Sequence, residues 1–161
     1  MLGIKLLGGV MIILSSFFVG RTLCSYERNR LLESEAFLNL IRHIKSEIFC
    51  YKTPLPKIIS SYTDKSLSSC GFLSSFDISW NDALTSSWDK LHIDGETKEL
   101  LLAFGKELGG SYKDEQINSC DYYANKLSEK IEKIRVELPQ KEKMYRSLAV
   151  VTGIFTVIIL M

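Results

Sequence analysis

The most regular hydrophobic pattern of the chain lies in its C-terminal third. Apolar residues recur there at alternating steps of three and four, which places them on one stripe of an α-helix: Ile117, Cys120, Ala124, Leu127, Ile131, Ile134 and Leu138. Ser111, followed by Asp114 three residues later, predicts the start of this helix. The last fifteen residues, 147–161, contain no charge. The pattern predicts one long helix that packs against a partner and ends in a membrane anchor.

The first twenty residues form a second apolar segment, with Lys5 as their only charge. At a helical rise of about 1.5 Å per residue, this segment is about 30 Å long, which matches the hydrocarbon core of a bilayer. It therefore predicts a membrane-spanning helix. The alternative is a cleaved leader peptide, but residues 19–23 offer no A-x-A-like cleavage site with small residues at the right places.

The segment that follows the first apolar stretch is predicted to stay helical through residues 22–51. Its apolar stripe is Phe37, Ile41, Ile44 and Ile48, broadened by Leu40 and Phe49. Thr53 and Pro54 then end this helix, because the residue before a proline disfavours the α conformation. The same pair predicts a new short helix, with Thr53 as N-cap, Pro54 as its first residue and Leu55 on its buried side.

The middle of the chain alternates between loop and helix. Residues 63–78 are rich in serine and are predicted to form a loop. A helix over 79–91 follows, with Trp80, Leu84 and Trp88 on one face. Asp94 predicts the start of another helix, and a glycine pair predicts its end. The apolar stripe of that helix and the glycines after it are Leu101, Phe104, Leu108, Gly109 and Gly110.

Together these patterns predict an all-α protein with three parts. A cytoplasmic antiparallel helical bundle at 22–146 is flanked by transmembrane helices at 1–21 and 147–161. Arg21 follows the first span, and Lys143 and Arg146 precede the second, so these positive charges belong to the middle of the chain. Because cytoplasmic flanks of membrane helices carry an excess of Lys and Arg, we expect the bundle to face the cytoplasm and the chain to cross the membrane twice.

Charge and cysteine content exclude several classes of protein. The formal net charge is +1, and no Asp or Glu occurs before Glu27 or after Glu142. A nucleic-acid-binding domain would normally carry a basic excess, so we expect no nucleic-acid partner. The four cysteines are widely spaced, without a CxxC pair or nearby histidines. We expect reduced thiols that pack as small hydrophobes, and no metal site.

No residue pattern indicates catalysis. Gly105 and Lys106 resemble the end of a phosphate loop, but Glu107 follows where Ser or Thr is needed. The two histidines, His43 and His92, are expected to be surface or half-buried helix residues. Carboxylates of the last helix alternate with lysines, as on a solvated helix face. We therefore expect no enzyme activity, no cofactor and no small-molecule substrate, and a role in binding and assembly.

Four segments of the sequence carry a resemblance to a known family. They are MLGIKLLGG at 1–9, EIFCYKTPL at 47–55, GKELGGSYKDEQ at 105–116, and KMYRSLAVVTGIFTVIILM at 143–161. Together, in this order and spacing, they resemble stage III sporulation protein AB of endospore-forming bacteria. The positions that carry the family signature are Glu47, Tyr51, Thr53, Pro54, Leu55, Gly105, Leu108, Gly109 and Gln116. The sequence departs from the family at Ala149 and at Pro139.

The resemblance implies a non-enzymatic component of a channel-like complex between mother cell and forespore. It implies a location in the mother-cell membrane around the forespore. The implied partners are other proteins of the stage III sporulation A operon, including an ATPase that would dock on the cytoplasmic helices. The family's helical region is similar to the F-type platform proteins of type II secretion and type IV pilus systems. That similarity implies a platform that couples a motor to membrane-embedded parts.

Three alternatives stay open at this point. The chain could be a secreted helical domain with a cleaved leader, which would place its cysteines in an oxidising compartment. It could be a general secretion or pilus platform subunit. It could also be a membrane-associated enzyme, which would need a nucleophile, a metal set or paired carboxylates that the sequence does not show.

Overall fold

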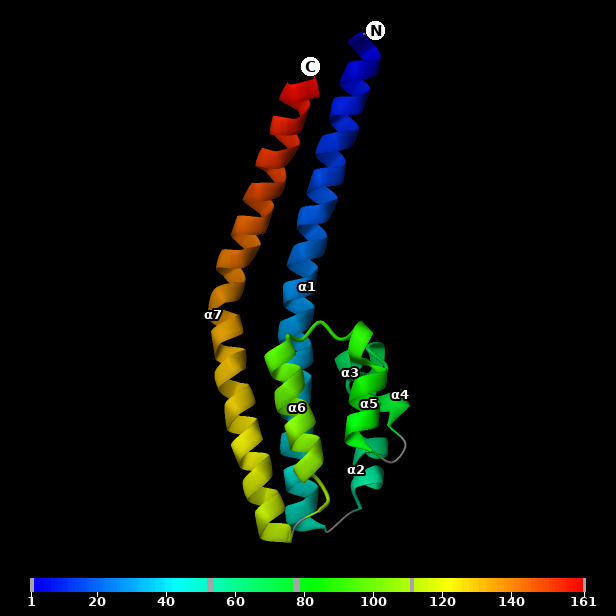
Figure 1. Cartoon of the computed structure of the whole chain (residues 1–161), viewed down its shortest axis with the longest axis vertical. Coiled ribbons are helices and arrows are strands. Elements are labelled where there is room, and N and C mark those ends of the chain that lie inside the picture. Colours follow the sequence, from blue (N-terminus) through cyan, green and yellow to red (C-terminus); the bar gives the residue numbers. More distant parts are fainter. Residues whose placement is uncertain (1, 52–53, 77–78, 111, 161) are drawn as a thin grey trace. The chain divides into compact units, whose positions relative to one another are not determined.

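The structure is a computed structural model that describes residues 2–51, 54–76, 79–110 and 112–160. Every regular element in these ranges is helical, so the predicted all-α class is confirmed (Figure 1). The chain divides into unit 1, which comprises Met1–Arg28 with Arg135–Met161, and unit 2, which is Asn29–Ile134. The elements are α1 (Leu2–Cys50), α2 (Leu55–Ser61), α3 (Lys65–Ser69), α4 (Phe72–Ser75), α5 (Trp80–Ser86), η1 (Trp88–Lys90), α6 (Gly95–Glu107) and α7 (Lys113–Leu160).

Neither predicted membrane span gains support from the structure. Within the described part of the chain, no helix combines the length and the apolar character that crossing a membrane requires. The predicted spans at 1–21 and 147–161 also include side chains that lie outside the described residues, namely those of 1–10, 12, 13, 157 and 159–161.

The apolar stripe of α1 packs as the sequence predicts, with one exception. Phe37, Leu40, Ile41 and Ile44 are at most 1% exposed. Phe49 was predicted to broaden the stripe and instead is 63% exposed, so that prediction is wrong. The reason is helical geometry, because Phe49 follows Ile48 by one residue and is therefore rotated about 100° away from the stripe.

The stripe of α7 is confirmed where it lies in unit 2. Five of its residues are buried, namely Cys120, Ala124, Leu127, Ile131 and Ile134, while Ile117 and Leu138 at its two ends are half-buried. Within unit 2 the helix runs antiparallel to α1, because Lys45 pairs with Asp121 at 2.6 Å and Lys113 reaches the Phe49 carbonyl at 2.8 Å. The predicted capping residue Ser111 lies outside the described residues.

The predicted loop at 63–78 is wrong where α3 and α4 occupy it, and its residues 77 and 78 lie outside the described residues. The Asp64 carboxylate caps α3 by accepting from the backbone N–H groups of Ser66 and Leu67, at 2.8 and 3.0 Å. Gly71, with φ at 84°, then turns the chain into α4. Two buried side chains, Leu67 and Phe72, anchor the short helices. The hydrophobic pattern does not reveal these helices, because each has a single buried residue and the surrounding sequence is rich in serine.

Two predicted helix boundaries shift slightly. Pro54 is the N-cap of α2 and not its first residue, while Thr53 lies outside the described residues. The predicted helix at 79–91 divides into α5 and η1 around Ser87. There the Ser87 hydroxyl donates to the carbonyls of Ala83 and Leu84, which is a bonding pattern that competes with a continuing helix. The start of α6 is confirmed, since Asp94 accepts from the Thr97 N–H at 2.8 Å.

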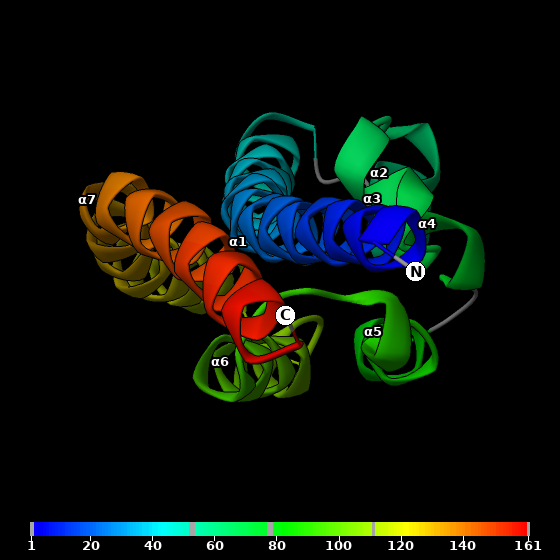
Figure 2. The same ribbon diagram turned by 90° about the horizontal axis from the view of Figure 1, so that it is seen from above.

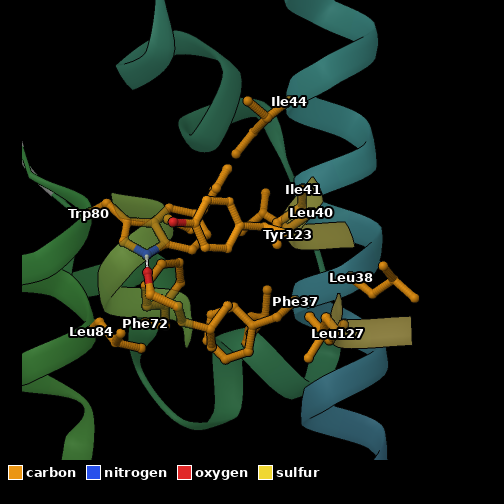
Figure 3. Close-up of a cluster of buried hydrophobic side chains, with 14 of the residues drawn as sticks. Phe37, Leu38, Leu40, Ile41, Ile44, Phe72, Trp80, Leu84, Tyr123 and Leu127 are labelled. Carbon is orange, nitrogen blue, oxygen red and sulfur yellow. Dashed lines mark hydrogen bonds between the residues drawn. The ribbon is translucent and has the colours of Figure 1, made fainter. Parts of the chain in front are cut away.

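The core of unit 2 is a chain of edge-to-face aromatic rings that joins five helices (Figure 3). Its members are Phe37 on α1, Phe72 on α4, Trp80 on α5, Phe104 on α6 and Tyr123 on α7. Successive ring centroids lie 5.1 to 5.5 Å apart, which is a favourable spacing for such pairs. The Trp80 indole N–H donates to the Leu101 carbonyl at 2.9 Å, so the ring is buried without an unpaired donor. Figure 2 shows the shorter helices of unit 2 grouped around α1.

Unit 1 is an antiparallel pair formed by the first part of α1 and the last part of α7. From Ser16 to Arg28 along α1, the contacts on α7 run back from Ala149 to residues 141 and 142. Ser16 donates to the Ala149 carbonyl at 2.6 Å, Lys141 contacts Glu27 at 3.5 Å, and Arg28 pairs with Glu142. Gly20 and Gly153 are buried in this pair. The small residues of the two segments therefore allow close approach of the helix backbones.

Candidate protein interface

The structure brings family-signature positions from distant parts of the chain to one end of unit 2. Glu47 and Tyr51 lie at the C-terminal end of α1, and Gln116 lies in the first turn of α7. These helix ends meet, since the Lys113 ammonium donates to the Phe49 carbonyl at 2.8 Å and lies 5.2 Å from the centroid of the Phe49 ring. The signature positions Pro54 and Leu55 follow α1 within a few residues and begin α2.

Several signature residues shape the backbone around α6. Gly105 lies against the Trp80 ring and the Asn81 side chain, so closely that a Cβ at this position would overlap both. Leu108 ends α6, with its N–H bonded to the Phe104 carbonyl at 3.0 Å. Gly109 adopts a φ of 89°, which favours glycine because a Cβ would be strained there. These residues therefore have structural roles, and they fix how the chain enters α7.

Exposed aromatic side chains surround the contact between α1 and α7. Phe49 is 63% exposed, Tyr51 is 73% exposed and Tyr112 is 85% exposed. We call these three residues the helix-end patch. Aromatic side chains are enriched at protein interfaces, because they bury a large area on binding and lose little conformational entropy. The patch is therefore a candidate surface for a protein partner.

Sequence reasoning found only one member of the helix-end patch as a site residue. Tyr51 belongs to the family signature, whereas the hydrophobic pattern places Phe49 in the core and predicts no role for Tyr112. A usable signal was present for Tyr112, which follows the Gly109 turn and precedes the periodic stripe of α7. Because this position lies outside every predicted apolar stripe, an aromatic residue there is expected to be exposed.

Polar contacts hold α6 and α7 together close to the Gly109 turn. The Glu107 carboxylate accepts from the Ser119 hydroxyl at 2.6 Å and from the Tyr123 hydroxyl at 2.9 Å. These hydrogen bonds lower the pKa of Glu107. Burial, followed by the neighbouring Glu107 carboxylate, raises the pKa of Tyr123 to about 12. Both groups therefore keep their bonded forms at neutral pH and fix the start of α7.

A second polar cluster fastens the segment before α6 to α1. The buried Glu33 carboxylate accepts from the His92 N–H at 2.7 Å and contacts His92 Nδ1 at 2.6 Å. Arg30 pairs with Asp94 one turn earlier on α1. Burial opposes ionisation of Asp94, but hydrogen bonds from Thr97 and the charge of Arg30 outweigh it and lower its pKa. His92 is half-buried, as expected, but it lies between η1 and α6 and not on a helix.

The chemistry of the cysteines and histidines agrees with a structural role. All four cysteines are free, and Cys24, Cys70 and Cys120 are buried while Cys50 is exposed. Burial raises the pKa of the Cys70 thiol, and it raises the pKa of Cys120 to about 11, so both stay protonated and unreactive at neutral pH. Among the described residues, no group of three or more His, Cys, Asp and Glu side chains could hold a metal ion.

The predicted membrane-flanking residues all lie in unit 1. Arg21, Lys143 and Arg146 are exposed. Arg146 lies 3.8 Å from Glu142, the same carboxylate that pairs with Arg28. All three cations therefore lie on the surface of the helix pair.

The fold and these surfaces define the class of protein. It is an all-α protein built on two long helices that pack antiparallel, with an aromatic patch where the helices of unit 2 end. The family model described as stage III sporulation protein AB (spore_III_AB) matches residues 5–161. The chain therefore belongs to the stage III sporulation protein AB family, which indicates a role in sporulation. No curated protein and no solved structure gives a significant match.

Proposed function

We propose that this chain is a non-enzymatic membrane component of a channel-like complex between mother cell and forespore. In this proposal unit 1 inserts into the mother-cell membrane, and unit 2 lies in the mother-cell cytoplasm and docks the ATPase of the same operon. Membership of the sporulation family supports the setting. An analogy with secretion platforms, which rests on the sequence resemblance alone, adds the idea of a membrane protein that offers a helical surface to a motor.

The observation that carries the docking proposal is the helix-end patch. The core of unit 2 buries several aromatic residues, among which Phe37, Phe72 and Phe104 are at most 1% exposed. The side chains of Phe49, Tyr51 and Tyr112 instead face solvent around the fixed junction of α1 and α7. Large apolar side chains on a rigid helix junction favour a protein partner, because little ordering is needed before they bind.

The membrane part of the proposal is supported by the exposed side chains of unit 1. A large set of them is apolar, and each is more than half exposed: Met11, Leu14, Phe17, Phe18, Val19, Leu148, Val150, Val151, Ile154, Phe155 and Ile158. An apolar surface built from so many exposed side chains is unfavourable in water. Lipid chains would cover it on both helices.

A binding measurement tests the docking surface. The purified full-length chain in neutral detergent is titrated with the purified ATPase. Tyr51→Ala together with Tyr112→Ala is expected to weaken binding at least tenfold, because both side chains would be buried at the contact. Tyr122→Ala is the matched control, since Tyr122 is an exposed tyrosine of α7 outside the patch. Equal loss of affinity in the control, or no loss in the double variant, would remove the patch from the proposal.

Orientation is tested by thiol labelling of Cys50. Cys50 is exposed next to Phe49, whereas Cys70 and Cys120 are buried and unsuitable for a membrane-impermeant reagent. A variant that keeps only Cys50 is expected to react after the mother-cell membrane is permeabilised and not before. Labelling in intact cells would place unit 2 outside the cytoplasm and contradict the proposed contact with the ATPase.

A further inference from the structure

A groove of about 410 Å³ lies between the two helices of unit 1. On α1 its lining residues follow a single helix face, from Phe17 through Arg21 to Arg28. On α7 the groove is lined by Arg146, Ala149 and Val150. At a rise of about 1.5 Å per residue, the groove follows α1 for about 16 Å.

Small residues bring the two helices together at the groove. A Cβ placed on Gly20 would lie 2.7 Å from the Ala149 Cβ and 3.4 Å from the Tyr145 carbonyl oxygen. The backbones therefore approach closely at this point, and neither Gly20 nor Ala149 has a side chain that could fill the groove. Longer side chains on either side form its walls.

The groove changes character along its length. One end is apolar, with Phe17 57% exposed and Val150 52% exposed. Arg21, Arg28 and Arg146 line it as well, and because the helices are antiparallel, Arg28 and Arg146 lie toward the opposite end. A ligand that fits this polarity has an apolar tail and an anionic head.

The positive charge of the groove exceeds the negative charge beside it. Glu142 contacts both Arg28 and Arg146, so one carboxylate faces two of the three arginines. No described carboxylate pairs with Arg21, which is exposed. Two positive charges are therefore left over. The guanidinium group matches the geometry of a phosphate, because it can donate two parallel hydrogen bonds.

We propose that this groove binds one anionic phospholipid, with its phosphate at the three arginines and an acyl chain along Phe17 and Val150. The proposal rests on the proposed insertion of unit 1 into a membrane. Glu142 competes with the phosphate for Arg28 and Arg146, so it sets how tightly the lipid is held. The site would select a lipid headgroup by charge at the place where the protein enters the bilayer.

A lipid titration tests the groove. The full-length chain in neutral detergent is titrated with phosphatidylglycerol, and complexes are counted by native mass spectrometry. We expect saturation at one lipid per chain and at least tenfold weaker binding of phosphatidylcholine. Arg21→Gln and Arg146→Gln are each expected to weaken the binding of phosphatidylglycerol about tenfold. Glu142→Gln is expected to tighten it severalfold, because two arginines lose a competing carboxylate.

The control is Lys143→Gln, since Lys143 is an exposed cation of the same helix that does not line the groove. It is expected to change binding less than twofold. An equal loss in Lys143→Gln would show general attraction to basic charge and overturn the site, as would the absence of a saturating stoichiometry. Inorganic phosphate that displaces the lipid at equal concentration would assign the arginines to free phosphate and also overturn the proposal.

A flotation assay separates this proposal from the proposed function. The chain is reconstituted with vesicles of pure phosphatidylcholine and with vesicles that also contain phosphatidylglycerol. Insertion into both, without a lipid bound at one per chain in the titration, refutes the groove and leaves the membrane role intact. If the chain inserts into neither kind of vesicle, the membrane role itself is refuted.

Discussion

Units 1 and 2 use the same two helices in opposite ways. In unit 2 the apolar stripes of α1 and α7 point inward, and the aromatic chain from Phe37 to Tyr123 joins them to the shorter helices. In unit 1 the large apolar side chains point outward, and the helices meet through Gly20, Ala149 and Ser16. One unit thus contains its own core, and the other leaves its apolar surface to its surroundings.

The difference follows from what each segment has to pack against. A stripe at steps of three and four buries apolar surface in water only when further helices cover it, and α2 to α6 supply that cover in unit 2. Among the described residues of unit 1, no further helix covers the pair. Its two helices meet through small residues, a hydrogen bond and ion pairs. The contrast is open to direct tests.

The largest expected effect is a charge placed in the core of unit 2. Ile131 is 2% exposed on the stripe of α7, so Ile131→Asp would bury a carboxylate without a partner. We expect a loss of about 4 kcal/mol or more in the free energy of unfolding, and with it the loss of a cooperative melt. Thermal melting followed by circular dichroism measures it, with Ile131→Val as a control that costs about 1 kcal/mol. An unchanged melting curve would refute the packed stripe.

A smaller effect is expected where Gly105 touches Trp80. Gly105→Ala would place a methyl group on the indole ring, so the ring or α6 must shift. We expect destabilisation of about 1–3 kcal/mol in chemical denaturation. Gly95→Ala is the matched control in the same helix, because a Cβ there meets nothing within 4 Å. It should change stability by less than about 1 kcal/mol. Equal effects of the two variants would contradict the close contact.

The Asp94 contact predicts a dependence of unit 2 on pH. The pKa of Asp94 is lowered from 3.8 in the folded chain, so its stabilisation is present above that pH and is lost as the pH falls through the folded pKa. Asp94→Asn keeps a capping side chain but removes the charge next to Arg30. At pH 7 the variant should be less stable, by at most about 1 kcal/mol because the pair is partly exposed. The difference in unfolding free energy between the unaltered chain and Asp94→Asn should be present at pH 7 and should shrink as the pH falls below 3.8. A difference that stays constant with pH would contradict the proposed role of the Asp94 charge.

The smallest effect on unfolding is expected from the outward face of unit 1. Phe18 is 72% exposed, so Phe18→Ser removes no buried contact. It should change the melting of unit 2 by less than about 0.5 kcal/mol. If unit 1 inserts as proposed, the same variant should reduce partitioning into phosphatidylcholine vesicles, because an apolar ring would be lost from the surface proposed to face lipid. A change in melting together with unchanged partitioning would contradict the conclusion that the large apolar side chains of unit 1 face outward.

Sequence periodicity was sufficient where many equivalent residues support one helix. The stripes of α1 and α7 repeat over several turns, so a single misplaced residue such as Phe49 does not obscure them. Periodicity failed at α3 and α4, where each helix has one buried anchor, Leu67 or Phe72. Helices this short show no hydrophobic repeat, and they form only because the core buries their anchor residue.

The candidate surfaces were less accessible to sequence reasoning. Tyr51 and Tyr112 are separated by sixty positions in the chain, and only the contact between Lys113 and Phe49 shows that they belong to one surface. The same holds for Arg21 and Arg146, which the sequence marks as flanking charges and the structure places on one groove. Pairing of Glu33 with His92 is likewise invisible without the fold.

By itself the sequence determined the all-α class, the two long helices, the start of α6 and the membership of the sporulation family. The helical properties depend on local spacing and on capping residues, which act over a few positions along the chain. Family membership depends on the sequence of nearly the whole chain, residues 5–161. Tertiary structure alone decided which aromatic residues enter the core, which remain exposed at the helix ends, and which arginines share a groove. These outcomes depend on contacts between residues far apart in the chain, and the register of one helix against another sets them.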